Sequence, residues 1–241
     1  MNRGAVASLL LLWAVGGALA DAGNVMTDGV FIAHHPSSMQ FTSDQTWYQP
    51  YLDEFAIASC QDQHNRIDLD GTKGQISIWY VLAAYSDSTS WGAAEFGFGD
   101  FRPNPDIYRF IEWGPCFPEK GLDISTDGWP GPNEGTAIAC TGAPWEGTIL
   151  PVYYFAGYAY AEGIIPLADN PQTDFIGTSV LLRRPPPVGR RAEAAGEMGL
   201  FRDGLTVCPP SGSSASRLEE FYSQLTSPPH PPPPVGASSR R

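Results

Sequence analysis

Histidine and carboxylate side chains near the start of the chain are the groups that could bind a metal ion. His34 and His35 are adjacent. The remaining ligands of a zinc site would have to come from residues elsewhere in the chain: His64, Asp53 or Glu54. Neighbouring residues of a strand point to opposite faces, so the paired imidazoles are poorly placed to share one ion. The spacing argues against a metal centre, and the sequence predicts no metal and no cofactor.

A second candidate cation site lies at residues 66–71, which resemble part of a calcium-binding loop. If Gly71 takes the position of the required glycine, Arg66 stands at the first ligand position and Ser77 at the last. Asp and Glu are needed there, so the EF-hand interpretation fails. An Asp-Gly turn before a strand explains these residues better.

Catalytic signatures are absent from the sequence. There is no Gly-x-Ser-x-Gly elbow, no His-Glu-x-x-His helix and no phosphate-binding glycine loop. A pair of carboxylates can still converge in space, as in glycosidases, because sequence spacing does not constrain it. The first residues to inspect for such a pair are Asp53, Glu54, Glu95 and Glu112. A secreted hydrolase is therefore kept as the alternative function.

Aromatic residues near turns give a hint of ligand binding. Trp91, Trp129 and Trp145 lie close to Gly or Pro and are expected to be more exposed than Trp79. Exposed rings stack on sugars through their apolar faces. Together with Glu134, the three tryptophans form the candidate ligand-binding set. The alternative is that the rigid loop at 126–135 folds across the end of the domain, with its tryptophan as a plug.

The region from residue 29 to 182 contains short apolar runs separated by Gly, Pro and Asp. The runs at 75–85 and 151–160 are apolar on both faces, which is typical of central strands. Seven further strands are expected, at 29–33, 55–60, 93–98, 107–113, 136–141, 164–167 and 205–208. Most connections are too short for crossover helices. The sequence therefore predicts an all-β fold, an antiparallel β-sandwich for which an immunoglobulin-like architecture is one option.

The two ends of the chain differ from its centre. Residues 1–20 have the charged start, apolar run and small-residue exit of a signal peptide. That run is too short for a membrane span, and no transmembrane segment is expected after its removal. The domain is placed at 21–182, with an ordered part that extends to about 210 if Cys208 is bridged.

Residues 183–241 are interpreted as a proline-rich tail, because polyproline stays extended and buries no core. One amphipathic helix is expected within it, near 217–226. Ten residues are too few for a stable isolated helix, so this segment is expected to dock, either on the domain or on a partner.

Charge restricts the class of partner. The chain carries a formal net charge of −12, and residues 21–182 hold 21 acidic against 5 basic side chains, a net −16. Nucleic-acid binding relies on clustered cations, so it is excluded as a function of this domain.

Four cysteines fit an exported protein: Cys60, Cys116, Cys140 and Cys208. None forms a Cys-x-x-Cys pair, which favours two structural disulfides over a zinc site or a redox dithiol. Three pairings are possible, and the predicted one joins neighbours along the chain, Cys60 with Cys116 and Cys140 with Cys208.

Taken together, these features predict an exported, non-catalytic β-sandwich with a binding or structural role at a cell surface, in a periplasm or outside the cell. The expected ligand is a carbohydrate or a protein.

Overall fold

The computed structural model describes residues 25–36, 39, 41, 57, 59–101, 107–116, 121–140, 144–180 and 188–210. The predicted signal peptide at 1–20, the helix near 217–226, and Asp53 and Glu54 lie outside this part of the chain. None of the described helices is long and apolar enough to cross a membrane.

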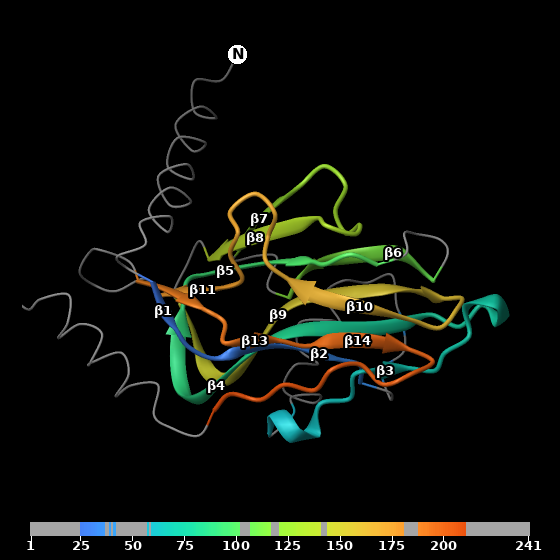
Figure 1. The fold of residues 1–241 in the computed structure, drawn as a ribbon, viewed down its shortest axis with the longest axis horizontal. Coiled ribbons are helices and arrows are strands. Elements are labelled where there is room, and N and C mark those ends of the chain that lie inside the picture. The colour runs from blue at the N-terminus through green and yellow to red at the C-terminus, as the bar shows by residue number, and fades with distance from the viewer. Residues whose placement is uncertain are drawn as a thin grey trace, which may run out of the picture.

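Two sheets packed face to face form the domain, as predicted for a β-sandwich (Figure 1). The first sheet has five strands in the order β13-β2-β4-β9-β6. Their bounds are β2 Val30–His34, β4 Ser77–Trp91, β6 Tyr108–Pro115, β9 Trp145–Ala159 and β13 Ala194–Ala195.

The second sheet has nine strands in the order β1-β12-β11-β5-β10-β14-β3, with β8 paired to β5 and β7 paired to β8. Their bounds are β1 Val25–Thr27, β3 Arg66–Ile67, β5 Ala93–Phe98, β7 Gly121–Ser125, β8 Gly135–Cys140, β10 Gly163–Ala168, β11 Gly177–Val180, β12 Val188–Arg191 and β14 Glu197–Leu200. Two short 3-10 turns complete the described part, η3 Cys60–Asp62 and η4 Gly71–Lys73. Strand β7 lies at the outer margin of this sheet, beyond β8 and β5 (Figure 1).

Strands β4 and β9 are the centre of the five-stranded sheet, as their two-faced apolar pattern predicts. Each has 15 residues, and they pair antiparallel from Ser77↔Gly157 to Trp91↔Trp145. Alternate residues point to opposite faces, so Trp79 and Phe155 enter the space between the sheets while Tyr80 points outward. Both faces of this pair must be covered, because both are apolar.

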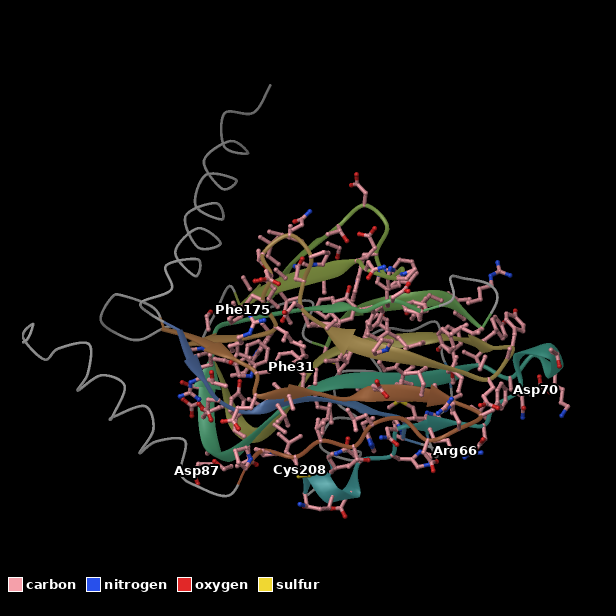
Figure 2. All side chains as sticks on the ribbon, in the orientation of Figure 1. Phe31, Arg66, Asp70, Asp87, Phe175 and Cys208 are labelled. Atoms are coloured by element: carbon pink, nitrogen blue, oxygen red, sulfur yellow. A yellow bond between two sulfur atoms is a disulfide. The ribbon has the colours of Figure 1, made fainter. Side chains whose placement is uncertain are left out.

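The main core fills the space between the two sheets with interlocked aromatic rings. Phe98 lies at its centre, with ring centroids 4.7 Å from Trp129, 5.1 Å from Phe155 and 5.9 Å from Phe110. Phe31 enters the same core from β2 and is labelled in Figure 2. Dense aromatic packing of this kind fixes how the sheets face one another, because ring pairs prefer particular geometries.

The outer face of the five-stranded sheet is covered by chain from two distant regions. Met39 is buried on it, and Phe41, Ile57 and Val207 pack against it from the flanking segments. The Cys60–Cys208 disulfide joins these two covering segments. Gln63 strengthens the junction, since its Nε2 donates to the carbonyl oxygens of both Cys60 (2.7 Å) and Val207 (2.8 Å). Figure 2 shows Cys208 beside the helical turn that begins at Cys60.

The predicted cysteine pairing is therefore wrong. Cys60 bonds Cys208, 148 residues away, and Cys116 is a free, fully buried thiol. Burial raises the pKa of the Cys116 thiol well above its usual value. Pairing neighbours along the chain failed because the segment between Asn65 and Cys208 forms most strands of both sheets before the chain returns to the outer face.

The sandwich also continues past Leu182, where the change of composition had suggested that the tail begins. Strands β12 and β14 each join the nine-stranded sheet, and Arg190 of β12 forms a buried ion pair with Asp28 (Nη1–Oδ2 3.1 Å). A paired charge in the core is indistinguishable in sequence from a basic tail residue, so composition alone does not mark where the domain ends.

Most ladders are antiparallel as expected, including all those of β4, β5 and β9. Three short marginal ladders are parallel instead: β1 with β12, β13 with β2, and β14 with β3. The expected strand at 205–208 is irregular, and the described residues of the expected strand at 55–60 form no strand. These segments are covering chain, whose apolar residues resemble those of a strand.

Loss of the Cys60–Cys208 bond is expected to lower the free energy of unfolding by about 2–5 kcal/mol, because the bond closes a very long loop in the unfolded chain. Urea unfolding of Cys208→Ser against the parent protein measures this change in the free energy of unfolding.

Peptide mapping without reduction should find Cys60 joined to Cys208. The Cys116 thiol should react with iodoacetamide only after unfolding; a Cys60–Cys116 peptide would contradict the assignment.

Candidate functional site

Trp91 and Trp145 form a buried pair instead of an exposed sugar platform. They are cross-strand partners at the ends of β4 and β9, with ring centroids 4.2 Å apart and an edge-to-face arrangement. Trp91 has no exposed surface and Trp145 is 9% exposed. The expectation of exposure was wrong because both strands extend as far as these residues, and the strand register then places the rings against each other.

Trp129 acts as a plug, which was the alternative considered for its loop. Its indole ring stacks on Phe98 at 4.7 Å and its Nε1–H donates to the Tyr153 hydroxyl at 3.2 Å. The peptide bond from Trp129 to Pro130 is cis. The ring is therefore part of the aromatic core, and it does not join the other two tryptophans on one exposed face.

Glu134 lies at the end of the same loop and is partly exposed. Its side chain packs against Gly128, where an added Cβ would lie 2.5 Å from Glu134 Oε1. Its backbone oxygen accepts from the amide of Phe98 at 2.8 Å. Of the four predicted ligand-binding residues, Trp129 and Glu134 thus share one loop, and that loop leads from β7 into β8.

A polar cluster lies beside this loop, between the edge strand β7 and strand β9 of the facing sheet. The Asp123 carboxylate of β7 accepts hydrogen bonds from the Tyr153 hydroxyl (2.7 Å) and from the Thr136 hydroxyl. Ser125 donates to the same carboxylate at 3.1 Å. Burial, and then the nearby Asp123 charge, raise the pKa of Tyr153 far above its usual value, so the phenol keeps its proton and acts as the donor. The cluster anchors β7 to β9 in the facing sheet.

With Asp123 and Ser125 turned inward, Leu122 and Ile124 of β7 point to the outer face of the nine-stranded sheet. Their side chains are 38% and 46% exposed. Their cross-strand neighbours on β8 are the small residues Ala139 and Ala137. This set, which we call the β7 face, is an exposed apolar surface without a charged side chain. The sequence contained its signal, an apolar-polar alternation over five residues, but the segment was too short to stand out.

An exposed aromatic side chain flanks the same margin. Trp113 of β6 is 38% exposed, and its cross-strand partner Phe155 belongs to the main core, so Trp113 points toward the space between the sheets. Within the described residues, four large apolar side chains are at least 38% exposed. Three of them, Trp113, Leu122 and Ile124, lie on β6 and β7. Exposed apolar side chains therefore lie on both edge strands, with Trp113 facing the space between the sheets and Leu122 and Ile124 on the outer face.

The candidate catalytic carboxylates in the described part do not converge. Glu95 lies on the outer face of the nine-stranded sheet, where it accepts from Thr173, and burial raises its pKa. Glu112 lies on the outer face of the other sheet and accepts from the Tyr154 hydroxyl at 3.1 Å. The core separates these two groups, so they cannot act on one glycosidic bond.

His34, His35 and His64 hold two segments of the chain together through hydrogen bonds, and we call this group the histidine clasp. The backbone N–H of His64 donates to His34 Nδ1 (3.0 Å), and His35 and His64 donate from their Nδ1 atoms to the carbonyls of Ile78 (2.7 Å) and His35 (3.0 Å). No group of three potential metal ligands is found among the described residues. Burial lowers the pKa of His34 to about 4, helped by the neighbouring imidazoles. The clasp holds η3 and the disulfide against β2.

The rejected calcium loop is a capped turn. Asp70 caps η4 by accepting from the backbone N–H of Thr72 at 2.9 Å, and Arg66 is paired with Asp68. These contacts occupy the carboxylates that a calcium ion would need.

Comparison with known proteins gives little further guidance. No family model matches the chain, and no curated protein matches it. Among solved structures it is similar to a cohesin module from a Clostridium perfringens family 33 glycoside hydrolase, with a TM-score of 0.38 and 11% identity over 57% of this chain and 90% of that one. A likeness this remote carries no functional argument.

The Tyr153→Phe variant is expected to lower the free energy of unfolding by about 1–3 kcal/mol, because it removes the donor to Asp123 and the acceptor of the Trp129 indole. Urea unfolding measures the change, with Tyr158→Phe as the matched control on the same strand. An equal effect at both positions would contradict the role given to the cluster.

Stability is expected to fall on acidification from pH 6.5 toward 4. His34 has a folded-state pKa of about 4 against its usual 6.5, so in this window the unfolded chain binds more protons than the native state. The loss is about 3 kcal/mol, and the lowered pKa of His35 acts in the same direction. The raised pKa of Glu95 has the opposite sign, since its proton stabilises the fold as the pH falls.

Urea unfolding at a series of pH values tests this expectation. In His34→Asn, the amide oxygen can still accept from His64 N–H but does not titrate, so the acid slope should become shallower. An unchanged slope in this variant would contradict the assignment to His34.

Proposed function

We propose that the protein is an exported, non-catalytic binding module that holds a partner protein on the β7 face. The observation that carries the proposal is the adjacent exposure of Leu122 and Ile124 beside small alanines on β8. Apolar side chains gathered at one margin of a soluble domain are typical of interaction surfaces. The polar cluster beneath β7 supports this role, because it holds the strand rigidly.

A protein ligand fits these observations better than a carbohydrate. Sugar binding was expected from Trp91, Trp129 and Trp145, and all three rings are buried. The β7 face offers aliphatic side chains, which bury apolar area without the flat ring that stacks on a sugar. The hydrolase alternative gains no support, since Glu95 and Glu112 lie on opposite outer faces.

Export agrees with the disulfide, because such bonds persist in oxidising compartments. The signal-peptide pattern at 1–20 points to the same destination. We therefore place the module at a cell surface, in a periplasm or outside the cell.

A photoreactive benzophenone side chain placed at position 122 is expected to cross-link a partner protein on intact cells of the native host. The same group at position 73 is the control, since Lys73 is exposed on η4, far along the chain from this face. A discrete adduct at 122 and none at 73 supports the proposal, and the recovered protein should begin at Asp21. Equal adducts at both positions, or none at 122, would contradict it.

A further inference from the structure

The free edge of β7 is a second feature of this margin, distinct from its exposed side chains. Strand β7 pairs with β8 on one side and with no other described strand. The ladder runs without a register shift from Gly121↔Cys140 to Ser125↔Thr136, and the Thr126 amide donates to the Gly135 oxygen at 2.9 Å. Hydrogen-bonded pairs alternate in an antiparallel ladder, so Leu122 and Ile124 bond β8. The N–H and C=O groups of Asp123 and Ser125 therefore point away from β8, along the free edge.

The facing sheet protects its corresponding edge with two devices that β7 lacks. Strand β6 has a register shift between Phe110 and Glu112 and ends in Pro115. Irregularity and proline are common devices that stop a sheet edge from pairing with another chain. Strand β7 has a regular register, no proline and no lysine. Its one charged side chain, Asp123, accepts from three hydroxyl groups, and the residue remains exposed.

The charge around this edge selects the partner. The hairpin formed by β7, its loop and β8, residues 121–140, contains no Lys or Arg and three acidic side chains, Asp123, Asp127 and Glu134. A second copy of the chain would bring the same negative charge to the interface, which opposes pairing between two β7 edges. A basic segment would be attracted to it.

We infer that β7 accepts an extended, basic segment of a partner protein as an additional strand of the nine-stranded sheet. The Asp123 and Ser125 backbone groups form the new ladder, and alternate apolar side chains of the segment lie beside Leu122 and Ile124. Main-chain bonds supply affinity in strand addition, and alternate side chains supply specificity. This inference rests on the proposed function and names the partner's chemistry.

A peptide of about nine residues in which Lys and Val alternate is the probe, because it is extended, basic and apolar on one face. Hydrogen exchange should slow about tenfold at the Asp123 and Ser125 amides when the peptide is added. A Glu-Val peptide of the same length is the control and should protect neither amide. Failure of the Lys-Val peptide to protect these amides, or equal protection by both peptides, overturns the inference.

Two changes test the main-chain bonds directly. Ser125→Pro removes the free-edge N–H, while Ser125→Ala removes only the hydroxyl group, so the proline variant should weaken peptide binding about tenfold and the alanine variant should not. An N-methylated Lys-Val peptide tests the same bonds with the unaltered protein, whether or not the proline variant folds. Equal binding of the methylated and unmethylated peptides contradicts strand addition.

The cross-link at position 122 separates the two proposals. If its adduct forms as strongly in Ser125→Pro as in Ser125→Ala, a partner occupies the β7 face without adding a strand; the inference then fails and the proposed function stands. If no adduct forms in any variant, the proposed function itself fails.

Discussion

Strands β4 and β9 are apolar on both faces, and this constraint organises the domain. Each must be covered twice, because an uncovered apolar face would lose the free energy that its burial contributes. The nine-stranded sheet covers one face through the aromatic core around Phe98. Chain that is distant in sequence covers the other face, and the Cys60–Cys208 bond holds that cover in place. The need to cover both faces of β4 and β9 therefore accounts for where the disulfide lies.

The same arrangement explains where charged and polar groups are buried. Asp28 and Arg190 pair where β12 lies beside the connection from β1 to β2, and the Arg190 guanidinium lies over the Tyr85 ring at 5.6 Å. The histidine clasp secures the turn at Cys60, and the Asp123 cluster secures β7. Each of these polar groups joins a marginal segment to the central strands. Removal of one partner would leave the other buried without compensation, which is why such sites are sensitive to substitution.

The sequence was sufficient to predict the sandwich and its two central strands, since runs that are apolar on both faces identify buried strands directly. It could not show which residues face each other across a ladder. Trp91 and Trp145 seemed to be exposed turn residues because their pairing depends on the register of strands far apart in the chain. The predicted cysteine pairing failed for the same reason. The β7 face was missed because Leu122 and Ile124 are only two apolar residues in a short strand, and their exposure depends on β8 being their neighbour.

Coverage of the central strands leaves β7 as a regular, unpaired edge within the described chain, and the inferred strand addition depends on that edge. Amide hydrogen exchange of the free protein, resolved residue by residue along 121–125, tests it most directly. Slow exchange is expected at Leu122 and Ile124, whose amides bond β8, and fast exchange at Asp123 and Ser125. Slow exchange at all four amides would show that another part of the chain already pairs with this edge, and would contradict the account.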